Sequence, residues 1–296
     1  MLNASNVRLI QTKYGYWTYE PKPSVEQLSD YYAKKYYQNG CGSYEVEYSK
    51  EELKYFRLKA TLLFRQVNRI RQDKCSSLLD VGCGEGWLLD KFYREKAAVK
   101  AIDFNAFALS KFHPHLKSYF EQGDIYGLLA KEVNSGNKYD VIVLANVLEH
   151  VVDPVGLLAK LKKLLAKKGI LVIVVPNDFS NLHNYLLKEK LIDSPFWLAY
   201  PDHLSYFNKT SMENLINDLG FNLESVLADN PIDLNLINPG SNYIKYPDKG
   251  KEAHSFRVRL DNFLAGISEE KLLDLYTTLG SMGVGRDLNY YCSLKR

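Results

Sequence analysis

Apolar positions follow two different periods along this chain, and the pattern changes near residue 76. From there onward, short apolar runs alternate with segments of helical spacing, which is the order that builds a parallel sheet covered by helices on both faces. Seven apolar runs predict strands, over residues 77–81, 98–103, 117–120, 139–145, 169–175, 221–227 and 287–294.

The clearest helical pattern covers residues 155–168, where five leucines fall on one face. Asp153 and Pro154 come before it, as an N-cap followed by a proline at the first helical position. Gly169 follows a pair of lysines, which is typical of a helix end. We therefore expect a helix here and assign its lysines to the solvent-facing side.

Three stretches interrupt the alternation and predict accessory parts. Before residue 76 the pattern predicts helices over 25–37 and 50–71 and no strand of comparable strength. Residues 177–207 mix polar and aromatic side chains, and about 60 residues separate the last two predicted strands, far more than an ordinary loop. The expected layout is a helical N-terminal cap over 1–75 and an α/β core over 76–296, with insertions at 177–207 and 230–285.

Composition excludes several classes of protein. The chain has 296 residues, 46% of them hydrophobic and 25% charged, as in ordinary globular proteins, and its net charge of +3 does not favour nucleic acid. No run reaches the ~18 apolar residues of a membrane helix. The first residues lack the apolar core of a signal peptide, so we expect a cytoplasmic protein. Its four cysteines contain no C-x-x-C pair, which predicts neither zinc nor disulfides.

Tyrosine is the one unusual component, with 22 residues, many of them before residue 60. Tyrosine suits half-buried helix faces, and in one interpretation these side chains serve packing. Alternatively, they line an aromatic cap over an acceptor pocket. The sequence leaves both interpretations open.

A glycine-rich loop follows the first strand of the core, with the sequence L-L-D-V-G-C-G-E-G over residues 78–86. A strand, a tight turn and a helix N-terminus form the nucleotide site of many α/β proteins. The spacing differs from the dinucleotide pattern G-x-G-x-x-G, whose third glycine would occupy the position of Trp87. Asp80 would repel a pyrophosphate and suits a cationic, amine-bearing ligand. S-adenosylmethionine fits these features better than NAD.

Four motifs in order now resemble those of class I S-adenosylmethionine-dependent methyltransferases. They are D-V-G-C-G-E-G at 80–86, A-I-D at 101–103, G-D-I at 123–125 and Y-D-V-I-V-L-A at 139–145. The resemblance covers about 76–228. It implies a Rossmann-like, seven-stranded, mostly parallel sheet whose antiparallel last strand inserts beside the fifth. It also implies methyl transfer that leaves S-adenosylhomocysteine as product.

The resemblance assigns cofactor-binding roles to the loop and the strand ends. In the loop, the glycines let the backbone approach the methionine part, and Asp80 faces its ammonium group. Further along, the adenosine part is expected to contact Asp103 through its ribose, and Phe104, Asp124 and Ile125 through its adenine. The alternative for Asp103 and Asp124 is a carboxylate that only caps its own loop. The residues predicted to bind cofactor are Asp80, Gly82, Cys83, Gly84, Gly86, Asp103, Phe104, Asp124, Ile125 and Asn146.

Two histidines are candidates for a catalytic base. His150 lies near the position of the transferred methyl in the family, although it could instead shape the start of the next helix. His203, with Asp202 to orient its ring, precedes the helix expected near residue 210, or it could hydrogen-bond its own loop. Imidazole suits the deprotonation of a hydroxyl because its unperturbed pKa is near neutrality.

Flanking motifs resemble two branches of the family. The V-V-D-P motif at 151–154 matches ubiquinone-biosynthetic O-methyltransferases, some of which bind a divalent metal through Glu-x-x-Glu-His. Here Asn146 replaces the first Glu, so no metal is predicted. Segments 21–32, 201–207 and 283–290 resemble bacterial methyltransferases of surface-polysaccharide biosynthesis.

The acceptor that this second resemblance implies is a sugar or glycan precursor. Arg257 or Arg286 would then meet a phosphate or carboxylate on it. The alternatives are a phenolic or lipid-like small molecule, or a module that binds S-adenosylmethionine without catalysis.

Overall fold

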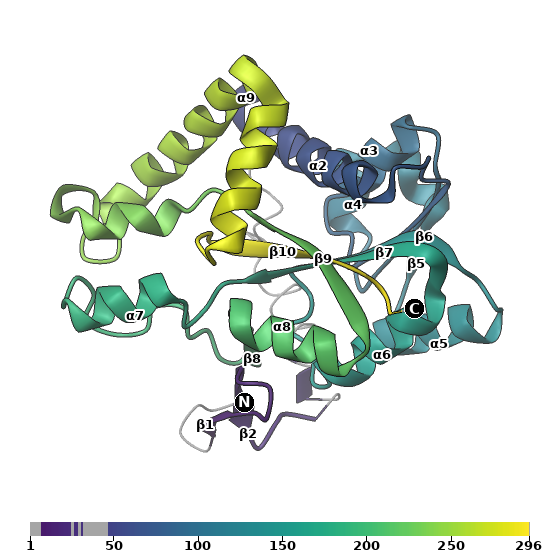
Figure 1. Cartoon of the computed structure of the whole chain (residues 1–296), viewed down its shortest axis with the longest axis horizontal. Helices are drawn as coiled ribbons and strands as arrows, with labels where there is room; N and C mark the ends of the chain where they lie inside the picture. Colours follow the sequence, from purple (N-terminus) through teal and green to yellow (C-terminus); the bar gives the residue numbers. More distant parts are fainter. Residues whose placement is uncertain (1–6, 25–26, 29–30, 32–46, 296) are drawn as a thin grey trace.

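A twisted sheet of seven strands forms the centre of the protein (Figure 1). The computed structural model describes residues 7–24, 27–28, 31 and 47–295. The strands lie in the order β5-β4-β3-β6-β7-β10-β9. Their bounds are β3 (Ser77–Val81), β4 (Ala98–Asp103), β5 (Phe120–Gln122), β6 (Tyr139–Ala145), β7 (Leu165–Pro176), β9 (Phe221–Ala228) and β10 (Asp287–Leu294).

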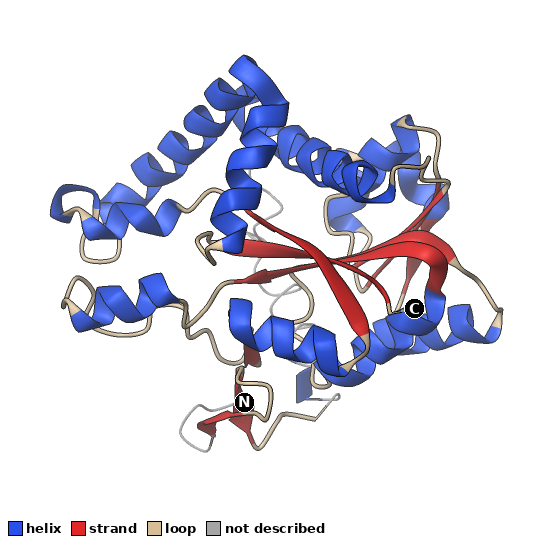
Figure 2. Cartoon of the chain, viewed as in Figure 1, coloured by secondary structure: helices blue, strands red, loops and turns tan. Residues whose placement is uncertain are grey.

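Helices cover both faces of this sheet (Figure 2). Successive residues of a strand point to opposite faces, so Leu78 and Leu79 enter two different cores. One core is closed by α5 (Ile125–Asn134), α6 (Pro154–Leu164) and α8 (Lys209–Asp218). The other is closed by α2 (Lys50–Arg71), α3 (Trp87–Arg94), α4 (Phe107–Phe112) and α9 (Gly250–Ser281). This is the Rossmann-like architecture that the sequence predicts.

The last strand runs against its neighbours. Strand β10 is antiparallel to both β7 and β9 and lies between them, as the resemblance implies. Because it is antiparallel, its first residue, Asp287, lies beside Pro176 at the end of β7. The carboxyl ends of β3, β4, β6, β7 and β9 therefore share one edge of the sheet with the start of β10. We call this the carboxyl edge.

The N-terminal cap is not purely helical, which corrects the prediction for residues 1–75. Strands β1 (Arg8–Gln11) and β2 (Trp17–Glu20) form a hairpin, and β2 also pairs with β8 (Ser205–Tyr206). These strands are short and pair with a segment far along the chain, so no local pattern marks them. Helix α2 has its predicted bounds, whereas most of the predicted helix over 25–37 lies outside the described residues.

Two boundaries differ from the sequence prediction, those of α6 and β5. Helix α6 ends at Leu164 because Leu165 already pairs with Tyr139 of β6. Residues 114–119 form a 3-10 turn, so β5 begins at Phe120. The cap of α8 is Asn208, whose side chain accepts the Ser211 N–H.

The two insertions begin at the carboxyl edge. The first contains α7 (Asn181–Lys188) and β8, and the second contains 3-10 turns followed by α9, which is kinked at Ser268. In Figure 1 the first part of α9 rises to the top of the view, and the second part descends from there to the start of β10. In the described part of the chain, no helix is long and apolar enough to cross a membrane.

Candidate functional site

The glycine loop connects β3 to α3 in a backbone conformation that requires glycine. Gly82 and Gly86 have φ of +75° and +83°. A Cβ at Gly82 would overlap the Val147 side chain, and one at Gly86 would overlap Leu109. Around Gly84, by contrast, a Cβ would meet nothing within 4 Å. The loop is therefore packed from behind and open at its centre, next to Cys83, as a cofactor-binding loop requires.

Asp80 is a buried carboxylate without a compensating charge. It ends β3, is 2% exposed, and accepts no hydrogen bond from a side chain in the described part of the chain. Burial, together with the nearby Asp103, raises the pKa of Asp80 to about 7. A buried anion that lacks a partner is stabilised by a cation. Asp80 thus fits the cationic methionine end of S-adenosylmethionine.

Asp103 holds the glycine loop to the next strand. Its Oδ2 accepts the Gly84 N–H at 2.9 Å and its Oδ1 accepts the Asn105 N–H at 3.2 Å. Burial raises the pKa of Asp103, and these two hydrogen bonds oppose the rise. Each carboxylate oxygen retains acceptor capacity for a further donor. Asp103 is therefore a loop cap, and its contact with a ribose stays a prediction.

The other residues predicted to bind cofactor lie further along the same edge. Asp124 is the N-cap of α5, and its Oδ2 accepts the Gly127 N–H at 2.7 Å. Ile125 begins α5 and is half-buried, whereas the Phe104 ring is 44% exposed. Asn146 follows β6 with a φ of +53°. An exposed ring beside a strand end suits stacking on a base, but none of these contacts is tested by the structure itself.

Glu85 joins the loop to α2 and was not singled out from the sequence. Its carboxylate accepts hydrogen bonds from Tyr48 Oη and Trp87 Nε1, both at 2.6 Å. Its backbone carbonyl lies 2.7 Å from His113 Nδ1. The contact with Tyr48 connects the N-terminal cap to the cofactor loop.

His150 and His203, the two histidines predicted to act in catalysis, lie next to one another. Their rings are 4.8 Å apart between centroids and nearly perpendicular. The main chain brings them together, because the Glu149 carbonyl accepts the Leu204 N–H at 2.7 Å and the Ser205 N–H at 3.1 Å. Two histidines 53 residues apart in sequence thus lie side by side after β6.

The contacts of His150 indicate its tautomer. Its Nδ1 lies 2.6 Å from the Asp202 carbonyl oxygen, which can only accept, so Nδ1 carries the proton in the neutral ring. This leaves a lone pair on Nε2, the atom that would receive a proton. Nε2 lies 3.8 Å from Oε1 of Glu149, whose pKa burial raises well above its ordinary value.

Asp202 contacts His150 through its main-chain carbonyl. Its carboxylate accepts the Tyr31 hydroxyl at 3.1 Å. The expectation that this carboxylate orients the His203 ring stays a prediction.

Tyrosines of the N-terminal segment show the packing role considered from the sequence, whereas the aromatic cap over an acceptor stays a prediction. Tyr14 and Tyr16 are buried, and Tyr16 packs against Phe207 at 4.7 Å between ring centroids. Tyr31 contacts the histidine loop through Asp202. Other members of the group, Tyr32, Tyr36 and Tyr37, lie outside the described residues.

One group of side chains has a donor set for a metal ion. Among the described residues, Glu149, His150 and His203 have ligand atoms within 4.8 Å of one another. One carboxylate and two imidazoles suit a first-row divalent ion. The prediction that the chain binds no metal, which rested on Asn146, is not tested by this geometry.

Buried acids also lie along the part of the carboxyl edge formed by β7, β9 and β10 together with the segment after β6. We call this part the acceptor half, and the part formed by β3, β4 and β5 the cofactor half. Asp178 follows β7, and Asp287 begins β10 and donates its N–H to Asp229, just after β9, at 3.0 Å. Burial raises the pKa of Asp178 to about 7 and that of Asp287 to about 6. Asp178 shows the same signal as Asp80, an acid just after an apolar strand, and could have been found from it.

The two arginines expected near an acceptor lie in different surroundings. Arg286 Nη1 is 3.4 Å from Asp233 Oδ2 and 3.9 Å from Asp178 Oδ1. Arg257 lies over the Tyr55 ring, with its guanidinium carbon 5.7 Å from the centroid. Arg286 is therefore engaged with carboxylates of the protein.

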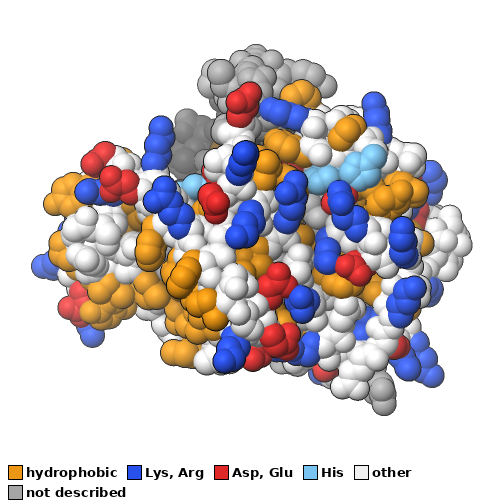
Figure 3. Space-filling view, turned by 90° about the horizontal axis from the view of Figure 1, so that it is seen from above, with side chains coloured by type: hydrophobic (Ala, Val, Ile, Leu, Met, Phe, Trp, Pro, Cys, Tyr) orange, Lys and Arg blue, Asp and Glu red, His pale blue; other side chains and the backbone are white. Residues whose placement is uncertain are grey.

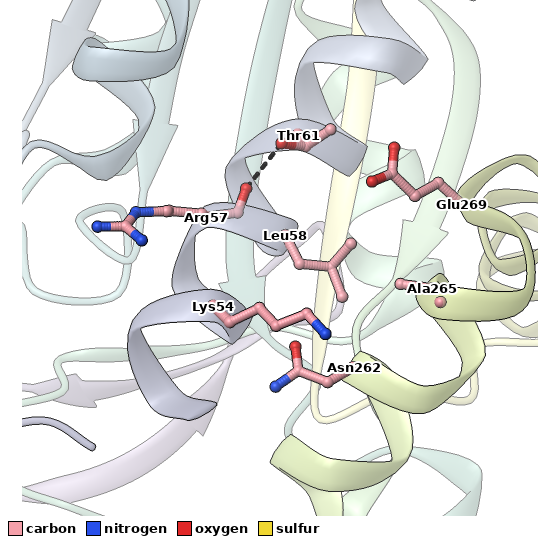
Figure 4. A pocket seen from close by; sticks show the side chains of 8 residues that line it. Lys54, Arg57, Leu58, Thr61, Asn262, Ala265 and Glu269 are labelled. Carbon is pink, nitrogen blue, oxygen red and sulfur yellow. Dashed lines mark hydrogen bonds between the residues drawn. The ribbon is translucent and has the colours of Figure 1, made fainter. Parts of the chain in front are cut away.

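A surface hollow of about 270 Å³ lies apart from this edge, between α2 and α9 (Figure 4). Lys54 and Arg57 of α2 and Asn262 of α9 line it. It contains none of the residues predicted to bind cofactor or acceptor. Figure 3 shows lysine and arginine side chains spread among acidic and apolar ones on the face drawn there.

Comparison with known proteins identifies the core. The sequence profile of a family described as a methyltransferase domain matches residues 53–226, more than half of the chain. A malonyl-[acyl-carrier protein] O-methyltransferase of Halalkalibacterium halodurans is 30% identical over 130 residues, which are 41% of this chain and 48% of the relative. A ubiquinone biosynthesis O-methyltransferase of Rhodopseudomonas palustris (strain TIE-1) is 29% identical over 100 residues, or 34% of this chain and 40% of the relative.

The chain thus spans less than half the length of these two relatives. Among solved structures, the plantazolicin methyltransferase BpumL, in complex with a desmethylPZN analog and SAH, shares the fold with a TM-score of 0.52. It is 17% identical, and the alignment covers 92% of this chain and 98% of that one.

Proposed function

The chain belongs to the class I S-adenosylmethionine-dependent methyltransferases, and we propose that it methylates a hydroxyl group of a sugar or glycan precursor. The observation that supports O-methylation most directly is the His150–His203 pair, which lies after the end of β6. The curated relatives named above are O-methyltransferases. The sugar acceptor rests on the flanking segments that resemble enzymes of surface-polysaccharide biosynthesis.

When bound, S-adenosylmethionine supplies an electrophilic methyl group on a sulfonium. The residues of the chain then bind, orient and deprotonate. Asp80 balances the positive charge of the methionine end, and Asp103 receives hydroxyl donors at the end of β4. His150 takes the proton of the acceptor hydroxyl on Nε2, while the Asp202 carbonyl holds its other nitrogen. His203 packs against the His150 ring and limits its rotation.

A neutral His150 ring that donates its Nδ1–H to the Asp202 carbonyl keeps the Nε2 lone pair for the proton of the acceptor hydroxyl. A neutral imidazole that is fixed by a hydrogen bond to one nitrogen is the common form of a general base. Positioning and the exclusion of water contribute the rest of the rate, since methyl transfer to an oxygen needs the two reacting atoms in line.

A phenolic or lipid-like acceptor is the second candidate function. Its support is the match to the ubiquinone biosynthesis O-methyltransferase and the aromatic side chains, such as Tyr19 and Tyr200, near the histidine loop. The third candidate function is binding of the cofactor without catalysis, and turnover with any acceptor would exclude it.

A screen of acceptors separates these candidates. The wild-type protein is incubated with S-adenosylmethionine and nucleotide sugars, free oligosaccharides or catechols, and S-adenosylhomocysteine release is measured. Release with a sugar and none with catechols supports the proposal. Release with catechols alone contradicts the sugar acceptor. If none of the compounds causes release, the proposal that the protein is an active methyltransferase is contradicted.

A further inference from the structure

A group of buried polar side chains lies at the carboxyl end of β7, next to the histidine pair. Asp178 is 1% exposed, and its N–H donates to the Phe207 carbonyl at 2.7 Å, in the segment that contains His203. Its carboxylate interacts electrostatically with Glu149 after β6 and with Arg286 and Asp287 at the start of β10. The group therefore lies where β6, β7 and β10 meet.

Several atoms of this group are buried without a hydrogen-bond partner. Within the described part of the chain they are Glu149 Oε2, Asn177 Oδ1, Asp178 Oδ1 and His183 Nδ1. Buried polar atoms in folded proteins are nearly always paired. A concentration of unpaired atoms at one place therefore indicates a missing ligand more than a defect of folding.

All four of these atoms can accept a hydrogen bond, whereas Trp197 Nε1, whose ring stacks on His183, is a donor without a partner among the described residues. Asn177 donates its Nδ2 to the carbonyls of Gly283 and Gly285 at 2.8 and 3.2 Å, which identifies the free atom as its oxygen. His183 Nε2 lies 3.1 Å from the Asp233 carboxylate, so Nε2 carries the proton and Nδ1 the lone pair. The ligand must supply several donors.

The charge of the group decides between the possible donors. Arg286 is engaged with Asp233, which also accepts the Tyr243 hydroxyl, so this guanidinium is already balanced by a carboxylate of the protein. A phosphate or carboxylate would meet Asp178 and be repelled. An ammonium group would meet the Arg286 guanidinium, 3.9 Å from Asp178. Neutral hydroxyl groups can donate to the unpaired oxygens without being repelled by Asp178 or by Arg286.

We propose that Asp178 and Asn177 form a subsite for a neutral, polyhydroxylated ring of the methyl acceptor, whose hydroxyls donate to the free oxygens of both side chains. The Arg286–Asp233 pair holds the subsite in place from behind. This inference rests on the proposed function and narrows it, since it assigns the uncharged sugar ring to this place and moves any phosphate of the acceptor elsewhere.

The experiment compares Asp178→Asn with wild type and with Asp193→Asn, a matched change at an exposed position. The asparagine keeps the size of the side chain but replaces one acceptor oxygen with a donor. Initial rates are measured on a panel of nucleotide sugars, free oligosaccharides and catechols. For a sugar that the wild type methylates, we expect KM to rise roughly tenfold, the effect of one lost hydrogen bond.

Two readouts separate binding of the ring from a general loss of structure. The Kd for S-adenosylmethionine stays unchanged in Asp178→Asn, because the cofactor lies along β3 and β4, and kcat changes less than KM. Asp193→Asn behaves as wild type in every assay. If Asp178→Asn does not fold, Asp178→Glu takes its place, since it keeps the charge and displaces the oxygens, with the same expectation.

Each remaining outcome has a definite meaning. Equal KM values for a sugar in wild type and Asp178→Asn overturn the subsite and leave the proposed function intact. Methylation of catechols alone overturns both. If no compound is methylated, binding of methyl glycosides to the protein saturated with S-adenosylhomocysteine is measured by NMR. Binding that Asp178→Asn weakens supports the subsite, and the absence of binding to wild type overturns it.

Discussion

The two halves of the carboxyl edge use carboxylates in opposite ways. In the cofactor half, Asp103 and Asp124 accept N–H groups of their own loops, at 2.7–3.2 Å. In the acceptor half, Glu149 and Asp178 have buried oxygens with no hydrogen-bond partner among the described residues. The carboxylates of the first half thus stabilise their own loops, whereas those of the second half keep acceptor capacity for a further donor.

Under the proposed function, this difference assigns the choice of methyl acceptor to the second half. A loop that satisfies its own polar atoms has one shape and serves one common ligand. Unpaired hydrogen-bond acceptor atoms on segments from three parts of the chain can be matched only by a substrate with donors in the corresponding positions. Breaking each half in turn should therefore produce different defects, and we describe the expected effects in decreasing order.

Loss of the proposed base should have the largest effect, and it falls in the acceptor half. His150→Ala is expected to lower kcat by 10²–10³, the usual contribution of a general base, with the Kd for S-adenosylmethionine unchanged. His203→Ala should lower kcat less, because it only supports the His150 ring. Turnover at saturating cofactor measures both.

The matched control for the histidine variants is His254→Ala, a change at a histidine that contacts Glu52 of α2 and lies outside the proposed site. If both His150→Ala and His203→Ala keep near-normal turnover, another group removes the proton. If His203→Ala has the larger effect, the roles of the two rings are exchanged.

Removing Asp103 should damage the cofactor half alone. Asp103→Ala removes the acceptor of the Gly84 N–H as well as the expected ribose contacts, so the Kd for S-adenosylmethionine should rise roughly 100-fold. Titration calorimetry measures this directly. An unchanged Kd would exclude Asp103 from the site and leave it as a loop cap.

The Asp80 carboxylate should lower the stability of the ligand-free protein and strengthen the binding of S-adenosylmethionine. Its pKa is raised from 3.8 to about 7 in the folded protein. Between these two values the folded state holds a proton that the unfolded state has released, so the stability of the ligand-free protein falls as the pH rises through this range. Asp80→Asn removes the effect, and at pH 8 it should stabilise the protein by roughly 2–4 kcal/mol.

The measurement for Asp80→Asn is the thermal midpoint of the ligand-free protein at several pH values. The gain over wild type should vanish near pH 4, where Asp80 is protonated in both states. The same variant should bind S-adenosylmethionine roughly tenfold more weakly. A gain that does not depend on pH would show that burial of the charge is not its cause.

Chelation of divalent ions should have the smallest effect. We expect turnover to be unchanged after dialysis against EDTA, because Asn146 replaces one carboxylate of the metal-binding pattern. Activity that is lost on dialysis and restored by magnesium or zinc would instead identify Glu149, His150 and His203 as metal ligands.

The cofactor half could be predicted from sequence because its contacts are local. Strands β3, β4 and β6 have their predicted bounds, and Asp80, Gly82 and Asp103 lie at their ends as expected. Each of these residues follows a buried apolar run by one or two positions. Hydrophobic period and glycine spacing carry that information directly.

The acceptor half depends on contacts that no local pattern contains. His203 lies beside His150 only because the Glu149 carbonyl binds two N–H groups of a distant loop. The hairpin of β1 and β2 exists because β2 pairs with β8, some 190 residues later. Asp178 follows a strand as Asp80 does, but its significance appears only when Arg286 is seen to be engaged with Asp233.

The hydrogen bond between Asp287 and Asp229 has a consequence for how such enzymes diversify. It joins the two ends of the segment between β9 and β10, so that segment leaves and re-enters the sheet at one point. A segment with joined ends can be lengthened, shortened or exchanged at little entropic cost to the strands beside it. Evolution, or an engineer, can therefore replace this part as a cassette and alter acceptor choice while the methyl-donor half is inherited unchanged.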